Sequence, residues 1–377
     1  MKWATVARAA AALFAACIVF YLPGRLWVNA RGGMAVSRRI GARTVCFKNK
    51  PGVLAWASAA GKKEGEGPYG AQFDEIFDDE WAGASSFEAA ERSMLENVVK
   101  RCVLRSGCET GDVQMLLAGD LLNQIISAGF AARSLGIPFY GLYGACSTMS
   151  ESLSIGSMLT DGGFADRLIC ATCSHFCTAE RQYRGPLELG GQRTPTAQWT
   201  VTGAGAVMLG GGAAARQARI VATHAVCGRV LDLGVTDANN MGAAMAPAAA
   251  DTLQALLTDL HQGFDDFDLV VTGDLGKLGR DLLIELLVQR GVRVREERLL
   301  DCGCEIFAPE QDAHCGGSGC GCSASMLCAH ILPELAAGRM RRVCFMATGA
   351  LLSPTSSMQG ESIPGVAHAI VMEHREA

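Results

Sequence analysis

The sequence predicts an α/β fold built from two similar halves. Short runs rich in Val, Ile and Leu alternate with longer helical patterns, which is typical of strands buried in a sheet that helices cover. The same succession of strand and helix patterns occurs twice along the chain. Hydrophobic residues make up 49% of the composition and charged residues 19%, so the chain is a packed globular protein and not a disordered one.

The repeat is clearest in a buried strand that runs into Gly-Asp, which occurs at residues 114–121 and again at 268–275. In both copies a small-residue turn then opens a helix, a strand that starts with Arg follows, and a last strand closes the half. These later pairs of segments are 144–147 with 319–323, 167–172 with 342–347, and 203–209 with 366–372. We therefore expect two βα halves, residues 35–215 and 216–377, packed face to face around a pseudo-two-fold axis. A ligand would bind where their strand ends meet.

Charge and cysteine content exclude several classes of protein. The 377 residues carry 33 Lys and Arg against 38 Asp and Glu, a formal net charge of −5. No global basic surface is then available for nucleic acid or an anionic bilayer, and we expect no nucleic-acid partner. Sixteen cysteines are too sparse for a small disulfide scaffold, and a chain of this length needs no covalent cross-links. We therefore expect a reducing compartment.

The N-terminal segment, residues 1–33, is left out of the fold prediction. It contains 14 uncharged residues, 9–22, which follow Lys2 and Arg8. This run is shorter than the roughly 20 apolar residues that a membrane-spanning helix needs. Two interpretations stay open. The run is the core of a signal peptide or an anchor, or translation begins at Met34 and the first 33 residues are upstream sequence read in frame.

The small-residue turn of the first half carries a cysteine. In the run Gly-Ala-Cys-Ser-Thr at 144–148, small side chains let the chain turn sharply from strand to helix and place the sulfur of Cys146 at the helix N-terminus. Unpaired N–H groups and the helix dipole favour a thiolate or a bound anion at that position. We interpret Cys146 as a nucleophile or as part of an anion pocket. Most of the other cysteines are expected to be small buried side chains.

Longer runs of the sequence are more specific than this turn. They are GPYG at 67–70, AGDLLNQ at 118–124, GACST at 144–148, SH at 174–175, AERQYR at 179–184, GGQ at 190–192, DLGVTD at 232–237, MGAAMAPAAADT at 241–252 and ATGALLSP at 347–354. From about Gly41 to His374 the chain resembles the thiolase and ketoacyl-synthase superfamily and, within it, the stage V sporulation protein AD family. Met149 and Phe176 depart from the family pattern. The resemblance implies a thiolase-like layered αβαβα sandwich.

The resemblance also implies a part in the spore dipicolinate transport system. A condensing enzyme would need a second-half base and a thioester-oxygen ligand besides its thiolate. Where ketoacyl synthases of the third type place a His, this chain has Asp274 after Thr272-Gly273, and the later Asn position falls at 316–319. Where a thiolase has its second Cys, the chain reads Ala347-Thr348-Gly349. We therefore expect a protein that is not an enzyme and that binds dipicolinic acid.

Dipicolinate is a flat pyridine with two carboxylates. Its carboxylates are complemented by Arg side chains, by N–H groups at a helix start and by hydroxyls, and its ring by a flat apolar wall. The candidate ligand residues are Cys146, Ser147, Thr148, His175, Arg181, Arg184, Asp120, Asn123, Asp274 and Ser318. Asp120 and Asp274 would hold those cations or the Ca²⁺ that travels with dipicolinate. For each Asp, a strand-end turn or helix cap stays open. For Arg181 and Arg184, a solvated helix face stays open.

Other functions are weighed against binding. In an acyl-transfer enzyme, Cys146 would form an acyl thioester with His175 or His314 as base; in a structural assembly subunit, the pocket would be vestigial. The spacing of Cys170, Cys173 and Cys177 is metal-like, as is the group Cys302, Cys304, Cys315, Cys320 and Cys322. We nevertheless expect no metal site and no resident cofactor. The resemblance implies a homodimer, the stage V sporulation protein A membrane subunits as partners, and peripheral association with the inner membrane of the developing spore.

Overall fold

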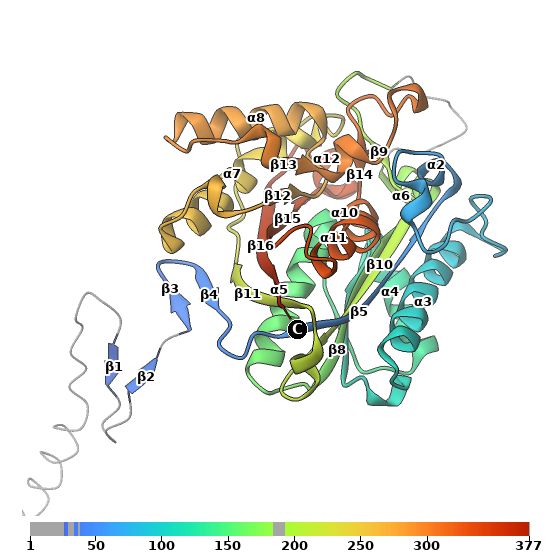
Figure 1. Cartoon of the computed structure of the whole chain (residues 1–377). Coiled ribbons are helices and arrows are strands. Elements are labelled where there is room, and N and C mark those ends of the chain that lie inside the picture. Colours follow the sequence, from blue (N-terminus) through green and yellow to red (C-terminus); the bar gives the residue numbers. More distant parts are fainter. Residues whose placement is uncertain (1–25, 29–33, 37, 184–192, 377) are drawn as a thin grey trace, which may run out of the picture.

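The computed structural model describes residues 26–28, 34–36, 38–183 and 193–376 (Figure 1). Ten strands follow one another across the main sheet in the order β13-β12-β15-β16-β11-β5-β10-β8-β6-β7. The first-half strands are β5 (Gly52–Ala60), β6 (Met115–Gly119), β7 (Phe139–Gly141), β8 (Arg167–Ser174) and β10 (Gly203–Gly210). The second-half strands are β11 (Ile220–Val226), β12 (Leu269–Thr272), β13 (Leu299–Asp301), β15 (Arg342–Ala350) and β16 (Gly365–His374).

The strand order reads the same outward from its middle in both directions. The segments that the sequence analysis paired occupy equivalent places: β6 with β12, β8 with β15, and β10 with β16. The two five-strand halves meet only where β5 starts beside β11, through the pairs Val53–Ile220 and Gly52–Val221. The expected pair of duplicated βα halves is therefore confirmed.

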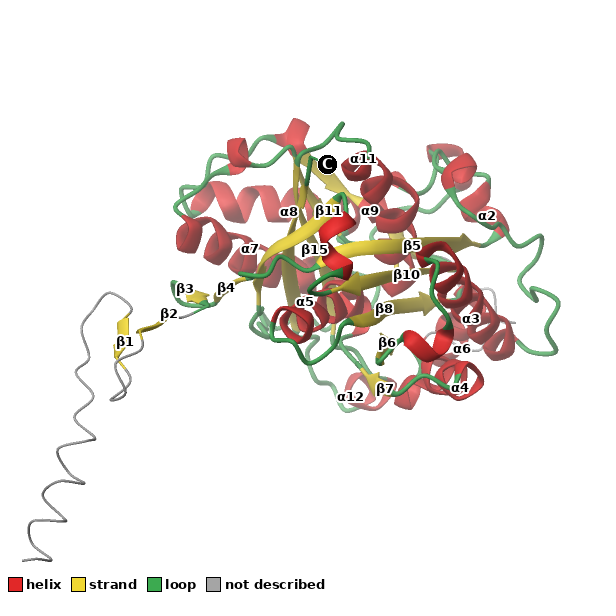
Figure 2. Cartoon of the chain, turned by 60° about the horizontal axis from the view of Figure 1, so that its bottom comes forward, coloured by secondary structure: helices red, strands yellow, loops and turns green. Residues whose placement is uncertain are grey.

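Helices form three layers around the two halves of the sheet (Figure 2). The outer helices of the first half are α3 (Phe87–Ser106) and α4 (Ile126–Leu135), and those of the second half are α7 (Met241–Leu260) and α8 (Gly276–Gln289). The central layer holds α5 (Thr148–Asp161) and the run of α10 (Cys320–Met326), η11 (Leu327–Ile331) and α11 (Leu332–Ala336). Shorter helices are α2 (Lys62–Gly65), α6 (Phe176–Tyr183), α9 (Cys302–Glu305) and α12 (Pro354–Met358).

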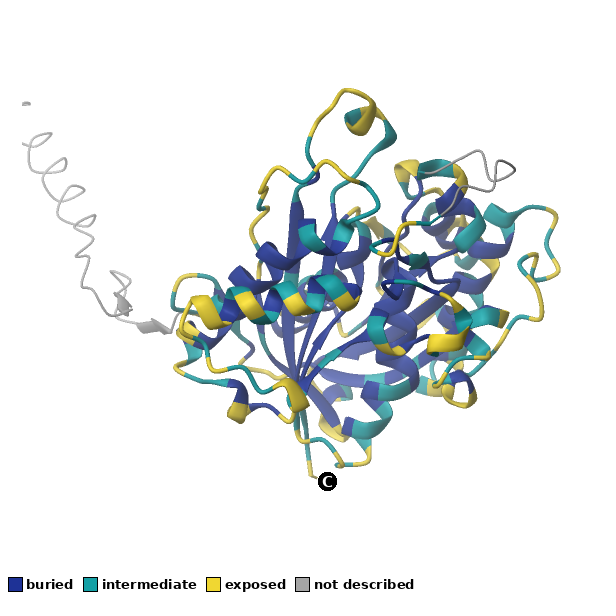
Figure 3. Ribbon diagram, turned by 90° about the horizontal axis from the view of Figure 1, so that it is seen from above, coloured by how far each residue is buried: buried dark blue, intermediate teal, exposed yellow. Residues whose placement is uncertain are grey.

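Three separate apolar cores show that the layers are αβαβα. Successive strand residues face opposite sides of a sheet. On β10, Val207 joins the central core and its neighbours Ala206 and Met208 join the outer core of the first half. On β15, Phe345 joins the central core while Cys344 faces the outer core of the second half. Figure 3 shows both halves of the sheet buried between helices whose outward faces are exposed.

Strands β3 (Arg39–Ile40) and β4 (Thr44–Cys46) pair with each other, and β4 also pairs with β11. The expected boundary at residue 35 assigns them to the first half, but they extend the sheet beside a second-half strand. The carboxylate of Asp259, at the end of α7, accepts the backbone N–H groups of Ala42, Arg43 and Thr44. Strands β1 (Leu26–Val28) and β2 (Met34–Val36) form a separate two-stranded sheet.

The short strands β9 (Trp199–Thr200) and β14 (Gly317–Ser318) pair with each other and bring the two halves together beside α6. Among the described residues, no helix is both long and apolar enough to cross a membrane. The apolar run 9–22 and the candidate Arg184 lie outside the described residues.

The central helix α10 packs closely on β10 because position 205 carries no side chain. A β-carbon at Gly205 would lie 2.6 Å from the carbonyl carbon of Ala324, a backbone atom that cannot swing away. We expect Gly205→Ala to lower the free energy of unfolding by about 1–3 kcal/mol in urea titrations, the usual cost of overpacking. Gly111→Ala is the matched control, since a β-carbon there meets nothing within 4 Å. Equal stability of the two variants would contradict this account of the central layer.

Candidate functional site

A pocket opens between the two halves, at the carboxyl ends of β6, β8 and β15. Its walls are apolar except for Cys146, Glu180, Tyr183, Thr200 and Ser318. The apolar lining residues are Leu121, Ala145, Ala179, Ala238, Met241, Ala350 and Leu352. The cavity volume is about 50 Å³, room for roughly four water molecules, and the space reaches about 520 Å³ when the open mouth is counted.

The turn that carries Cys146 rests on the second half of the fold. A β-carbon at Gly349, near the end of β15, would lie 2.5 Å from the carbonyl oxygen of Gly144, so the backbones are in direct contact. Ala145 takes a left-handed conformation, with φ of 50°, and this turns Cys146 toward the pocket. The hydroxyl of Ser147 donates to the carbonyl of Gly144, which ties the turn together.

Cys146 is held as a thiol and not as a thiolate. Its side chain is 6% exposed, and burial raises its pKa well above the usual value, with the charge of Asp274 as the next cause. The Asp274 carboxylate is an electrostatic neighbour of this thiol. The expectation that the helix N-terminus favours a thiolate is therefore wrong for this site, because desolvation and a nearby carboxylate outweigh the helix dipole.

Asp274 stands where the resemblance leads one to look for a His. It is fully buried at the end of β12, and its oxygens accept the N–H of Gly319 at 2.8 Å and the hydroxyl of Thr348 at 3.0 Å. Burial raises its pKa to about 7 despite these donors, and nearby Asp301 contributes to the same direction. Because its partners are already in place, Asp274 has little capacity left for a Ca²⁺ ion.

Asp120 occupies the equivalent strand end in the first half but has a different role. Its two oxygens accept the N–H groups of Leu122 at 2.8 Å and Ala128 at 2.7 Å, so the side chain ties the end of β6 to the first turn of α4. Burial raises its pKa to about 6. It does not line the pocket. Of the two interpretations left open for Asp120, the helix-cap interpretation describes what the structure shows.

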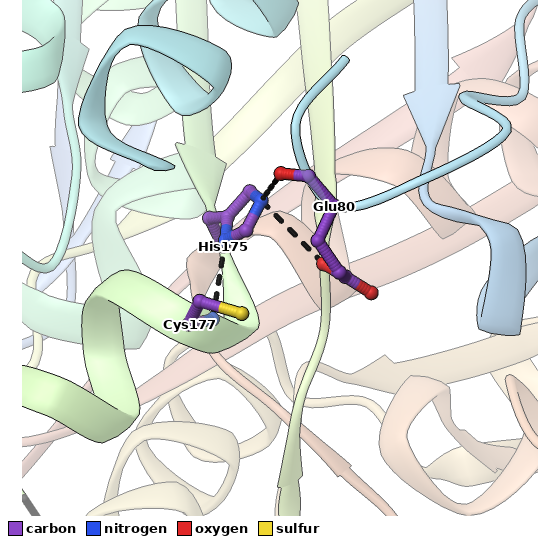
Figure 4. A group of neighbouring side chains, drawn as sticks. All are labelled: Glu80, His175 and Cys177. Atoms are coloured by element: carbon purple, nitrogen blue, oxygen red, sulfur yellow. Dashed lines mark hydrogen bonds and ion pairs between the residues drawn. The ribbon is translucent and has the colours of Figure 1, made fainter. Parts of the chain in front are cut away.

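His175 belongs to a group with Glu80 and Cys177, where β8 ends and α6 begins (Figure 4). One potential ligand atom of each lies within 4.8 Å of the others, the only such group in the part of the chain that the structure describes. His175 Nδ1 accepts the backbone N–H of Cys177 at 3.1 Å, so its other nitrogen, Nε2, carries the proton and donates to the Glu80 carbonyl at 2.9 Å. Burial lowers the pKa of His175 to about 4.

These contacts argue against a metal ion on His175. A histidine ligand normally binds the metal with one nitrogen and donates a proton from the other to an acceptor. Here the nitrogen opposite Nε2 faces an N–H donor instead. The neutral imidazole therefore links α6 to the Glu80 loop by hydrogen bonds. It does not line the pocket. His314 is also outside the pocket; its Nδ1 lies 2.9 Å from the carbonyl oxygen of Thr194.

The cysteine spacings do not converge on a metal site either. Cys170 and Cys173 face opposite sides of β8: the thiol of Cys170 donates to the carbonyl of Ser152 in the central layer, and Cys173 lies near Glu91 in the outer core. In the second group, the thiol of Cys320 donates to the carbonyl of Cys173. These thiols are satisfied as buried hydrogen-bond donors.

The remaining predicted residues are divided between the pocket and its surroundings. Ser318 lines the pocket together with Cys146. The hydroxyl of Thr148 donates to the carbonyl of Ala145 inside the turn. Arg181 forms an exposed ion pair with Glu88 on α3, and Asn123 is exposed, with its backbone N–H donating to Gln182. The structure does not bring Arg181 or Asn123 to the pocket wall.

Sequence reasoning missed Glu180, the charged residue of the pocket lining, and Arg193, its ion-pair partner. Glu180 is buried and lines the pocket, and Arg193 Nη2 lies 3.3 Å from its Oε1. The guanidinium also stands 4.4 Å from the ring centroid of Trp199, which stacks on Phe176 at 4.0 Å. Glu180 lies in the run 179–184, from which the sequence predicts Arg181 and Arg184, but not Glu180, as ligand residues.

Comparisons with known proteins agree with this architecture. The sequence profile of the family described as stage V sporulation protein AD matches residues 41–373. Stage V sporulation protein AD of Bacillus subtilis (strain 168) is 45% identical over 333 residues, which cover 88% of this chain and 97% of the relative.

Solved structures with the same fold are condensing enzymes and thiolases. The 3-oxoacyl-[acyl-carrier-protein] synthase III of Aquifex aeolicus VF5 superposes with a TM-score of 0.54 at 11% identity, over 86% of this chain and 100% of that one. The Acat5 thiolase of Ascaris suum, solved with coenzyme A, gives 0.54 at 10% identity, again over 86% and 100%. At such identities the likeness shows the thiolase-like fold and nothing about activity.

The buried carboxyl of Asp274 makes stability depend on pH. Because folding raises its pKa from 3.8 to about 7, its contribution is fully present below pH 4 and is lost as the pH rises through 7. Asp274→Asn lacks this titration. In urea unfolding, wild type should therefore lose about 2–3 kcal/mol relative to the variant between pH 5 and pH 8. A difference between wild type and Asp274→Asn that stays constant from pH 5 to pH 8 would overturn this assignment.

Proposed function

The chain belongs to the stage V sporulation protein AD family, and on that basis we propose that it binds dipicolinic acid, or its calcium chelate, without catalysing a reaction on it. In this proposal the protein supports uptake of dipicolinate into the developing spore and its release on germination. Membership of the family makes it a sporulation protein with a thiolase-like fold. The ligand and the absence of catalysis are inferred from the site.

The burial of Cys146 beside the Asp274 carboxylate is the observation that carries the proposal. A nucleophilic cysteine needs a thiolate at working pH, or a base that takes its proton as it attacks. Here burial and a neighbouring carboxylate both favour the thiol. The described histidines do not line the pocket. The groups around the sulfur of Cys146 therefore oppose its ionisation.

The pocket mouth suits a flat ligand with carboxylates. Apolar side chains such as Leu121, Met241 and Leu352 offer a wall for an aromatic ring. Arg193 pairs with Glu180 of the pocket lining, and its guanidinium lies over the ring of Trp199. A ligand carboxylate that arrives there would share its guanidinium, which is built for paired hydrogen bonds with carboxylates. If calcium enters with the ligand, Glu180 is the carboxylate that lines the pocket.

The partners in this proposal are the stage V sporulation protein A membrane subunits, at the inner membrane of the developing spore. A homodimer is also proposed. Strand β7 ends the strand order of the first half, and its Tyr140 is 62% exposed, with Tyr143 nearby at 54%. An edge strand that carries large exposed aromatic side chains can pair with a second copy.

Isothermal titration calorimetry with dipicolinate, with and without Ca²⁺, tests the binding site. We expect Arg193→Gln to weaken binding by at least about tenfold, the usual effect of losing one charge-assisted pair. Arg193→Lys should be intermediate, because it keeps the charge and loses the fork. Arg181→Gln is the matched control and should bind as wild type, since Arg181 pairs with Glu88 away from the pocket. Loss of binding in the control alone would refute the placement of the ligand.

Acyl transfer is the second candidate, favoured by the contact of a thiol with a carboxylate whose pKa is about 7. Such a carboxylate can in principle act as a general base. Wild type and Cys146→Ala are incubated with a panel of acyl-coenzyme A thioesters and examined by intact-protein mass spectrometry. We expect no mass increase in either. An added acyl group that disappears in Cys146→Ala, with release of free coenzyme A, would establish the enzyme and sink the binding-only proposal.

A further inference from the structure

The end of the molecule opposite the pocket carries four cations without a carboxylate partner. They are Lys50, Arg216, Arg219 and Arg375, and we call the surface that they form the basic junction face. The first three are exposed and Arg375 is half-buried. Among the described residues, no carboxylate lies within ion-pair distance of any of the four.

Backbone contacts hold these four residues around one point, the place where the two halves of the sheet meet. The N–H of Arg375 donates to the carbonyl of Arg219 at 2.7 Å, and its guanidinium donates to the carbonyl of Ala215, the residue before Arg216. Lys50 precedes Pro51, whose carbonyl accepts the N–H of Ala222 on β11. Three separate loops therefore converge there, and each brings one or two of these residues.

Three acids near this face are paired with other cations. Glu373 on β16 lies 3.2 Å from Arg342. Asp161, at the end of α5, lies 2.9 Å from Arg38. Glu376 pairs with Arg341. Exposed Asp166, whose carbonyl accepts the N–H of Gly211, is a further acid at this end. The four cations outnumber it, so the basic junction face keeps a net positive charge although the whole chain has a net charge of −5.

The N-terminal part of the chain joins the body at this same end. Helix α5 begins at the pocket and, about 20 Å further on, ends at Asp161, which pairs with Arg38. The uncharged run 9–22 in the sequence ends 16 residues before Arg38, within a reach of roughly 55 Å of extended chain. A surface with anionic groups above an apolar interior would contact both the uncharged run 9–22 and the basic junction face.

We propose that the basic junction face docks the protein on the surface of an anionic lipid bilayer. Lys and Arg near such a surface each strengthen binding about fivefold at physiological ionic strength. A short apolar segment alone gives weak attachment, and a second, basic contact is what makes such attachment stable. Docking on this face turns the pocket away from the membrane. The inference extends the proposed membrane association and is independent of dipicolinate binding.

Vesicle flotation with the full chain tests the proposal. The vesicles contain phosphatidylcholine alone or with 30% phosphatidylglycerol, at 0.1 M and 0.5 M salt. Lys50→Gln, Arg216→Gln and Arg219→Gln are combined in one variant. The matched control combines Lys62→Gln, Lys100→Gln and Arg133→Gln, three exposed cations on other elements with the same change of charge. Melting temperature and dipicolinate calorimetry are recorded for both, so that a failure of folding or of ligand binding is recognised separately.

Wild type and the control variant should bind the anionic vesicles, and the basic-face variant should bind at least tenfold more weakly at 0.1 M salt. High salt should weaken wild type toward the level of the variant, because charges are screened. Unchanged binding of the basic-face variant would overturn the proposal. So would equal losses in both variants, equal binding to neutral vesicles, or equal binding of the wild type to duplex DNA under the same conditions.

Discussion

The buried thiol of Cys146 and the buried carboxylate of Asp274 lie beside each other where the two halves of the fold meet at the pocket. One partner comes from the turn before α5 and the other from the end of β12, so the contact exists only when the halves are packed together. That packing depends on Gly349, which lets the turn rest on the backbone of β15. Burial at the seam raises the pKa of both groups. The chemistry of the site is therefore set by how closely the halves meet.

The fold was predictable because it depends on local patterns that occur twice. Buried strands, small-residue turns and helices recur in one order, and the strand order of the sheet follows that recurrence. The site was predictable only in part. Asp120 and Asp274 look equivalent in sequence, yet one accepts two N–H groups beside α4 and the other meets Thr348 and Cys146 from distant elements. Such differences arise from tertiary contacts that no local pattern encodes.

The positions of charged side chains were also not predictable from the sequence alone. Both arginines of the run 179–184 carry the right charge for a dicarboxylate, but Arg181 faces Glu88, while Arg193, after that run, pairs with Glu180 of the pocket lining. The net charge of −5 likewise conceals a face on which cations gather. Where a charged side chain points depends on the loop that carries it, and loops are the part of the chain least constrained by periodicity.

The crossed packing of the central layer has a consequence for how the protein is made. Helix α5 of the first half packs on β15 and β16, and α10 of the second half packs on β8 and β10. Helix α5 covers only part of the first-half sheet face, on β6, β8 and β10, so the first 215 residues leave the ribosome with the rest of that face bare, and the helix that covers it begins only at Cys320. At a synthesis rate of about 5–20 residues per second, that part of the sheet face stays exposed for several seconds before α10 is made. Nascent chains of this protein are thus natural clients for chaperones that shield apolar surface during translation.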